Sequence, residues 1–401
     1  MLFIKNILLI LILRYIFLTN EPEVNFEKKL LRYIRKHKKY ENVNDKELNT
    51  NSIIEYIYIM KNESINFQYY NNEIKKPKIS FISSVFNKGN YLRSLILSTQ
   101  YQILKKYEII FIDDCSTDQS VNIINDYIKI DKRIKLIINK KNKGALYSRV
   151  SGALYSKGEY IIFIDSDDLI LKEGLYNSYN YIKKNQLSMI QFNSIFYLQG
   201  NFILSKRYYF YKNIIQQPFL SYIFYYNELT HEGCESNTAL WDKLLERNIA
   251  LKAINYIGNE YIAKNIIIEN DVILLFSLFQ MSDSYQYINE LGYCYIRNHN
   301  DSISNSWNNK SIFNSILQGI FTNIKFLYEK TGNTYLDKLF CIFKFKKSFR
   351  RYNISFIHVK KENKLIKNTI DILLLSKYIS NVDKIIIANI QASISNLIFN
   401  Y

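Results

Sequence analysis

Short apolar segments alternate with helical patterns through the middle of the chain. Each short segment is almost continuously apolar, as is typical of strands buried on both faces of a sheet. The segments between them have apolar residues at helical spacing. The expected strands cover residues 78–85, 108–112, 134–138 and 160–164, and the expected helices cover 91–101, 120–130 and 146–156. This alternation predicts an α/β fold with a mostly parallel sheet covered by helices.

The regions on either side of this middle part have different patterns. Residues 1–20 are mainly apolar, and residues 21–75 are charged, rich in Asn and expected to form a helical stem. Residues 306–401 have apolar positions at helical spacing but carry no motif, so we expect a helical extension there. We therefore assign the functional domain to residues 76–305.

The apolar N-terminal segment favours an uncleaved membrane anchor over a signal peptide. Leu2 to Leu18 would span only about 26 Å as a helix, slightly less than the hydrocarbon core of a bilayer. The following Thr19 to Pro22 has no small-x-small cleavage pattern. We expect a membrane-associated protein of the endoplasmic reticulum or Golgi. The basic residues between 28 and 39 leave open which side of the membrane carries the domain.

Charge and cysteine content narrow the possible partners. The chain has 53 Lys and Arg against 36 Asp and Glu, a net charge of +17, which favours anionic ligands such as nucleotides or lipid head groups. It has no zinc-finger spacing and no RNA-recognition motif, so we expect no nucleic-acid partner. The 4 cysteines are scattered and form no CxxC pair, which argues against a zinc site or a disulfide scaffold.

Two acidic residues, Asp113 and Asp114, directly follow the second expected strand. In parallel sheets, ligands bind beyond the carboxyl ends of the strands, so these carboxylates could accept hydrogen bonds from a base or ribose. Alternatively, the acidic residues favour a helix start, because Ser116 to Asp118 are good capping residues.

A second acidic cluster, Asp165-Ser166-Asp167-Asp168, follows the fourth expected strand. Side chains at i and i+2 of an extended segment point the same way, so Asp165 and Asp167 can converge on one ligand. Such oxygen donors suit Mg²⁺ or Mn²⁺, with positions left for phosphate oxygens. The alternative is a solvated acidic turn, although closely packed carboxylates are costly without a cation.

These features lie in an order that resembles the family 2 glycosyltransferases, which have a GT-A fold. The family has a strand ending in a V-Y-N-like turn, then EII-x-x-DD-x-STD, N-x-G-x-x-x-ARN-x-G and GEYI-x-x-DSDD. The corresponding segments here are Val85 to Asn87, Glu108 to Asp118, Asn142 to Gly152 and Gly158 to Asp168. Four motifs in order within about ninety residues make a specific signal.

The resemblance implies roles for individual residues. Phe86 matches the aromatic residue beside the base, Asp114 the carboxylate that reads the base, and Arg149 an arginine near the nucleotide. The implied donor-binding residues are Phe86, Asn87, Asp113, Asp114, Arg149 and Asp165, and the metal ligand is Asp167 or Asp168. The chain departs from the family at Ser84, Cys115 and Val150, which puts the local loop shape in question.

An inverting transfer also needs a general base for the acceptor hydroxyl. The family has a Glu-Asp pair at a helix start in this part of the chain, where this sequence reads Glu269-Asn270-Asp271. We favour Asp271 as the base, with Glu269 second; the alternative role is capping of the helix that comes next. Trp241 lies in a W-x-K element that resembles one of the family, and it could line the sugar pocket or belong to the core.

The sequence therefore predicts a metal-dependent inverting glycosyltransferase that uses a nucleotide sugar, most simply a UDP-sugar, with Mn²⁺ or Mg²⁺. The acceptor could be a glycan, a protein or a lipid. One alternative is a catalytically degenerate member that binds carbohydrate or acts as a scaffold, suggested by Asn270 in the Glu-Asp pair. A DxD phosphatase is a lesser alternative, because Leu169 stands where such enzymes need Thr or Val.

Overall fold

The computed structural model describes most of the expected domain and a few positions of the expected C-terminal extension. The described residues are 69–198, 201–204, 214–217, 220, 239–266, 270–297 and scattered positions between 319 and 330. The expected anchor, almost all of the stem, most of the C-terminal extension and Glu269 lie outside them. Within these ranges, no helix combines the length and apolar character that a membrane span requires.

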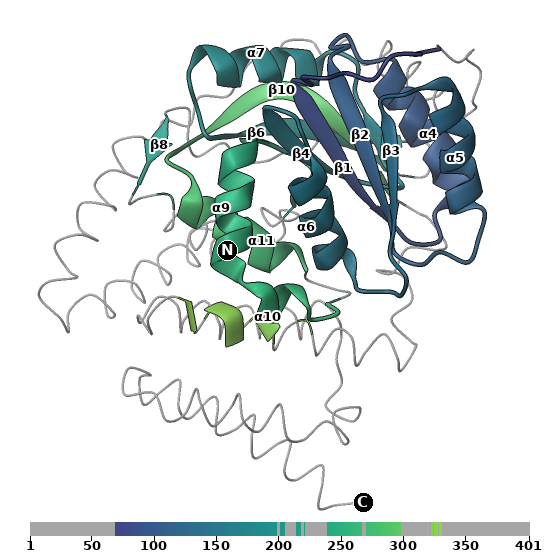
Figure 1. Ribbon diagram of the computed structural model, residues 1–401. Coiled ribbons are helices and arrows are strands. Elements are labelled where there is room, and N and C mark those ends of the chain that lie inside the picture. The colour runs from purple at the N-terminus through teal and green to yellow at the C-terminus, as the bar shows by residue number, and fades with distance from the viewer. Residues whose placement is uncertain are drawn as a thin grey trace, which may run out of the picture.

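The described chain alternates strands and helices in its first half, as the sequence predicts (Figure 1). The strands are β1 (Ile79–Val85), β2 (Tyr107–Asp113), β3 (Ile134–Ile138), β4 (Tyr160–Asp165), β5 (Leu169–Ile170), β6 (Met189–Leu198), β7 (Asn201–Leu204), β8 (Ile215–Gln216), β9 (Lys243–Glu246) and β10 (Ser284–Arg297). The helices are α4 (Gly89–Gln100), α5 (Ser120–Ile130), α6 (Ala145–Tyr155), α7 (Gly174–Lys184), α9 (Arg247–Ile257), α10 (Asn259–Ile262) and α11 (Asp271–Met281).

All these strands belong to one sheet in the order β3-β2-β1-β4-β9-β6-β10-β5, with β7 added on β6 and β8 on β10. The first four strands of this order are parallel to one another. The short strand β9 runs antiparallel to both β4 and β6, while β6 and β10 are parallel. The α/β prediction is confirmed. The expected parallel arrangement holds for the first half, whereas the second half is mixed.

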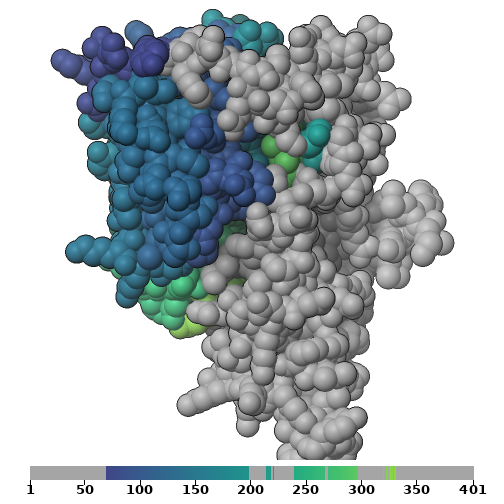
Figure 2. All heavy atoms as spheres, turned by 90° about the vertical axis from the view of Figure 1, so that its right-hand side faces the viewer, coloured from purple at the N-terminus to yellow at the C-terminus, as the bar shows by residue number. Residues whose placement is uncertain are grey.

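Successive side chains of a strand point to opposite faces of the sheet, so the parallel half has a separate core cluster on each face. Ile82, Ile110 and Phe163 belong to a core cluster shared with α6, α9 and α11. Phe81 and Phe111 belong to a second cluster shared with α4, α5 and α7. Figure 1 shows these two sets of helices on opposite sides of the sheet. Figure 2 views the side of the molecule that carries α4 and α5, where the purple-to-blue residues form much of the surface.

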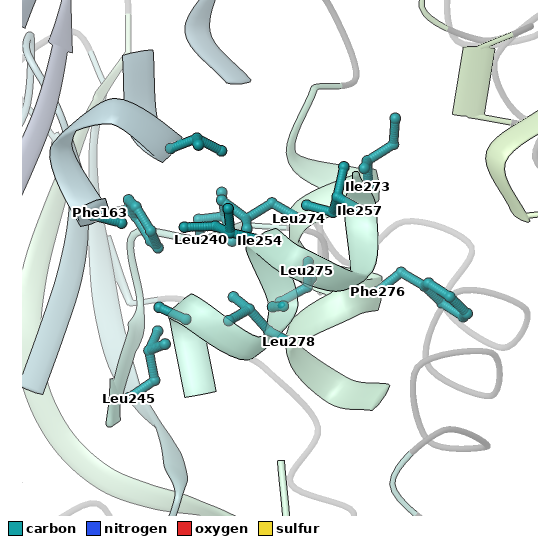
Figure 3. Close-up of a cluster of buried hydrophobic side chains, with 14 of the residues drawn as sticks. Phe163, Leu240, Leu245, Ile254, Ile257, Ile273, Leu274, Leu275, Phe276 and Leu278 are labelled. Atoms are coloured by element: carbon teal, nitrogen blue, oxygen red, sulfur yellow. The ribbon is translucent and has the colours of Figure 1, made fainter. Parts of the chain in front are cut away.

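Helix α11 is apolar around most of its circumference because it is buried between α9 and other core residues. Its residues from Val272 to Phe279 are all buried. Figure 3 shows side chains of α9 and α11 gathered with Phe163 of β4 and Leu245 of β9. Burial on this scale fixes the position of the amino end of α11, where Asp271 lies, relative to the sheet.

Some residues of the recognised motifs serve the fold. The buried carboxylate of Glu108 accepts hydrogen bonds from Ser80 Oγ (2.7 Å), Lys157 N–H (2.6 Å) and Lys135 Nζ (2.8 Å). Gly158 has no room for a side chain, because an added Cβ would lie 2.5 Å from the backbone nitrogen of Ser80. These two motif positions therefore stabilise the amino ends of β1 and β2, away from the carboxyl edge of the sheet.

Gly152 brings α6 into close contact with the sheet, and this contact gives a stability prediction. A Cβ there would lie 2.4 Å from Cγ2 of Ile82 and 2.6 Å from Cδ1 of Ile112. We expect Gly152→Ala to lower the free energy of unfolding by about 1–3 kcal/mol through overpacking. Urea unfolding would measure the change, with the exposed Leu154→Ala on the same helix as control. Equal stability of the two variants would contradict the prediction.

Candidate active site

The loops after β1 and β2 are joined at the carboxyl edge of the sheet by Asn87. Its backbone N–H donates to Ser116 Oγ (2.9 Å), and its Oδ1 accepts from Thr117 N–H (2.8 Å). Asn87 has a φ of 53°, a conformation that Asn tolerates better than most residues. It leaves the preceding ring of Phe86 44% exposed. An exposed aromatic ring beside this edge suits stacking against a planar ligand.

The carboxylate of Asp114 holds the loop between β3 and α6. Its Oδ1 accepts from Asn139 Nδ2 and Lys143 N–H, both at 2.9 Å, and its Oδ2 accepts from Gly144 N–H at 2.7 Å. A carboxylate offers about four lone-pair sites, so these bonds leave capacity for one more donor. Gly144 is required here because it has a φ of 86° and an added Cβ would lie 2.6 Å from Asn265 Oδ1.

Asp113 is buried beside Asp114 and accepts fewer side-chain hydrogen bonds. Its Oδ2 accepts from Ser116 N–H at 3.0 Å, and its Oδ1 has no hydrogen-bond partner among the described residues. Of the predicted capping residues, Asp118 binds the helix start: it accepts hydrogen bonds from the N–H groups of Ser120 and Gly89, both at 2.9 Å.

Asp168 is the most enclosed member of the second acidic cluster. Its Oδ2 accepts from the hydroxyl of Tyr293 and its Oδ1 from Ile296 N–H, both at 2.8 Å. Burial raises the pKa of Asp168 well above its usual value, and the charges of Asp167 and Asp165 add to this. Each oxygen of Asp168 therefore already binds β10, and the side chain is buried, so Asp168 is less accessible to a cation than Asp167.

Asp167 lies closer to solvent and pairs with a lysine that was not among the predicted site residues. Lys88 Nζ lies 2.6 Å from Asp167 Oδ2, and the two side chains are 15% and 21% exposed. Lys88 belongs to the loop after β1, directly beyond the V-F-N turn. Its position after that turn is the only sequence signal that could have indicated it, since 79 residues separate the partners.

Arg149 of α6 joins the acidic cluster to the start of α11. Its Nη2 donates to Asp165 Oδ1 at 3.0 Å, and its Nη1 donates to Asp271 Oδ1 at 2.6 Å and to Asn270 Oδ1. Burial raises the pKa of Asp165 to about 6; Arg149 opposes the rise, while the charges of Asp271 and Asp167 reinforce it. The arginine thus connects the expected donor-binding side with the expected general base.

The position of Asp271 bears on its alternative role as a helix cap. Asp271 is the first residue of α11, preceded by Asn270 as N-cap, and Asn270 makes no side-chain capping hydrogen bond. The side chains of both residues contact Arg149. An acidic residue in the first turn also suits the helix dipole, so the same residue can favour the helix and face the site.

Trp241 is only 6% exposed and lies in an aromatic cluster of the core. Its ring stacks on Tyr293 with centroids 4.6 Å apart and on Tyr295 at 5.6 Å. The core alternative for Trp241 is therefore the one that the structure favours. Through Tyr293, the cluster supports the hydroxyl that donates to Asp168.

The carboxylates at the carboxyl edge of the sheet also indicate how a divalent cation would fit. No group of three or more His, Cys, Asp or Glu side chains in the described ranges is arranged to hold a metal ion. Mg²⁺ and Mn²⁺ often take one or two carboxylates from a protein and further ligands from substrate phosphates. Asp167, partly exposed at the strand edge, fits a cation of that kind.

An α/β sheet with a half-exposed aromatic ring and acidic residues at its carboxyl edge is typical of a nucleotide-binding domain. Residues 80–247 match the family model described as "Glycosyl transferase family 2". The chain carries a glycosyltransferase family 2 domain with the GT-A fold. The family assignment predicted from the four motifs is confirmed, and it overrides the phosphatase alternative.

Individual relatives and a solved structure agree with this assignment. An uncharacterised glycosyltransferase of Haemophilus influenzae is 42% identical over 126 residues, 31% of this chain and 50% of that protein. A cholesterol galactosyltransferase of Borreliella burgdorferi is 29% identical over 275 residues, 64% of this chain and 73% of that protein. The chain thus spans about half the length of the Haemophilus relative.

The fold comparison covers more of the chain. The crystal structure of S. aureus TarS residues 1–349 in complex with UDP-GlcNAc matches with a TM-score of 0.56 and 16% identity. The match covers 80% of this chain and 89% of that one. The similarity establishes the GT-A fold for this chain.

Proposed function

We propose that this protein transfers a sugar from a UDP-sugar to an acceptor hydroxyl with inversion at the anomeric carbon. The observation that supports the proposal most is the contact of Arg149 with both Asp165 and Asp271, because Asp271, the proposed general base, then lies close to a proposed donor-binding residue. The family 2 domain and the fold shared with a UDP-GlcNAc complex support a UDP-sugar as donor.

The base of the donor would lie between Phe86 and Asp114. The exposed ring of Phe86 offers a stacking surface, and the remaining lone pair of Asp114 can accept an N–H from the base edge. A uracil N–H suits such an acceptor, and the backbone bonds to Lys143 and Gly144 hold the carboxylate in place.

Phe86 offers a test of donor binding that leaves the core unchanged, because the ring is already 44% exposed. We expect Phe86→Ala to weaken UDP binding by about tenfold, as loss of one base–aromatic stack does. Isothermal titration would measure the affinity, with Tyr69→Ala as a control, since Tyr69 is 73% exposed and precedes Tyr70, which pairs with Asp131 just before β3. UDP affinity like that of the wild type would contradict this placement.

The chemical step forms one bond to the anomeric carbon and breaks another. The acceptor oxygen attacks the anomeric carbon, Asp271 takes the hydroxyl proton, and the bond to the diphosphate breaks to release UDP. Arg149 orients the Asp271 carboxylate through Oδ1 and balances the negative charge of Asp165. No covalent sugar intermediate is required, so a second nucleophile is not part of the proposal.

A Mn²⁺ or Mg²⁺ ion would be held by Asp167 together with the diphosphate, and it would supply stabilisation of the leaving-group charge. We favour Asp167 over Asp168 as its ligand, because Asp167 is 21% exposed at the strand edge, whereas Asp168 is buried against β10.

Release of UDP tests the activity. The purified protein is incubated with individual UDP-sugars and Mn²⁺, and free UDP is measured with and without a mixture of acceptors. An active transferase releases UDP from one donor sugar in preference to the others, and the release stops when the metal is chelated. Binding of UDP-sugars without any release, across all donors and acceptors, would instead favour the degenerate carbohydrate-binding alternative.

A further inference from the structure

Lys88 has a rigid backbone and an extended side chain. Its N–H donates to Ser120 Oγ at 2.9 Å, and its carbonyl accepts from Tyr91 N–H (2.9 Å) and Leu92 N–H (3.2 Å) at the start of α4. From this fixed point the side chain reaches the β4–β5 loop, where Nζ lies 2.6 Å from Asp167 Oδ2. The ammonium also lies over the Tyr91 ring, 5.5 Å from its centroid.

The three carboxylates of the cluster have different kinds of partner. Arg149 is the partner of Asp165, and β10 supplies both hydrogen bonds to Asp168. The partner of Asp167 is a lysine, whose flexible stem lets a compact ammonium move several ångströms while the backbone stays still. Among these partners, Lys88 is the one suited to exchange.

We propose that Lys88 is an exchangeable counter-ion: it neutralises Asp167 while the donor site is empty and moves to the donor's diphosphate when a divalent cation takes the carboxylate. The inference rests on the proposed function. It deepens that function because it makes cation and nucleotide binding depend on each other. A cation arriving alone must displace the ammonium, whereas a cation arriving with a diphosphate gives the ammonium a new anionic partner.

Two affinities should therefore change in opposite directions when the ammonium is removed. In Lys88→Met without nucleotide, Mn²⁺ no longer competes with a tethered cation, so its affinity should rise about five- to tenfold. At saturating Mn²⁺ the same variant lacks a cation for the diphosphate, so its UDP affinity should fall about tenfold. A residue with only a structural role would not tighten metal binding.

The experiment measures Mn²⁺ binding by electron paramagnetic resonance and UDP binding by calorimetry on the full chain. Lys129→Met is the matched control: it removes the same charge from an exposed pair with Asp126 on α5, and neither affinity should change. Lys88→Arg keeps the competing charge and should bind free Mn²⁺ as the wild type does. Lys88→Gln replaces Lys88→Met if the latter does not fold, with the same two shifts expected.

The outcomes separate this inference from the function on which it rests. If wild type binds UDP and Mn²⁺ together but removal of the Lys88 charge leaves free Mn²⁺ affinity unchanged or weaker, the counter-ion role is wrong and the transferase proposal stands. If wild type binds UDP but no Mn²⁺ in its presence, the metal-dependent part of the proposed function fails together with the inference. Opposite shifts in the two affinities support it.

Discussion

An Asp271→Asn variant should lose sugar transfer by about a thousandfold, the size of effect expected when a positioned general base is removed. The amide cannot take the acceptor proton, but its oxygen can still accept the hydrogen bond that Arg149 donates to Asp271 at 2.6 Å. The loss should therefore appear in kcat, while the affinity for the UDP-sugar remains close to that of the wild type. Single-turnover transfer and donor titration measure the two quantities.

The controls separate a lost base from a disturbed helix. Asp271 is the first residue of α11, so unfolding of the variant is compared with that of wild type. Asp126→Asn, an exposed substitution of the same kind, should transfer at the wild-type rate. Glu269→Gln tests the second candidate: if it abolishes turnover and Asp271→Asn keeps turnover within tenfold of wild type, the base is Glu269.

The parallel half of the fold could be predicted because its signals are local. The expected strand 134–138 and helix 120–130 have the bounds of β3 and α5, and the other expected strands and helices of this half differ at their ends by only a few residues. Period-two alternation then separates the strand residues that belong to the two core clusters on opposite faces of the sheet. The mixed half was not predictable in this way, because β9 is short and pairs with strands far away in the sequence.

The candidate site, like the fold, could be predicted only in part from the sequence. Its acidic residues follow strands directly, so their meeting at one edge could be predicted from strand order. Their partners could not: Tyr293 and Asp168 are separated by 125 residues, and β10 reaches the cluster only because it pairs with β5 and β6. Pattern alone contains no information about such pairings.

The acidic cluster Asp165 to Asp168 shows how unpredicted partners change the interpretation of a motif. From the sequence, carboxylates so close together require a cation. In the structure, Arg149 and Lys88 supply protein cations for Asp165 and Asp167, and β10 supplies two neutral donors for Asp168. A divalent ion is therefore not needed to make the cluster stable. The case for a metal depends on the diphosphate that the site is proposed to hold.

Arg149→Met should have the largest combined effect on stability and activity. The side chain of Arg149 is 9% exposed, and its removal leaves Asp165 and Asp271 without their shared cation. Breaking one side of a buried ion pair costs about 3–5 kcal/mol, and the loss of stability should approach the lower end of this range since both carboxylates are partly exposed. Transfer should fall by at least about a hundredfold, because Asp271 loses the group that orients it.

Arg149→Lys tests whether the forked shape of the guanidinium matters as well as its charge. One ammonium keeps the charge but lacks the planar fork that reaches both carboxylates, so stability should recover more than transfer does. A double-mutant cycle of Arg149→Met with Asp271→Ala, which removes the acceptor altogether, should give a coupling energy of about 1–3 kcal/mol in unfolding, as expected for residues in direct contact. Strictly additive effects would mean that Arg149 does not position Asp271, and the link between the donor-binding edge and the general base would have to be abandoned.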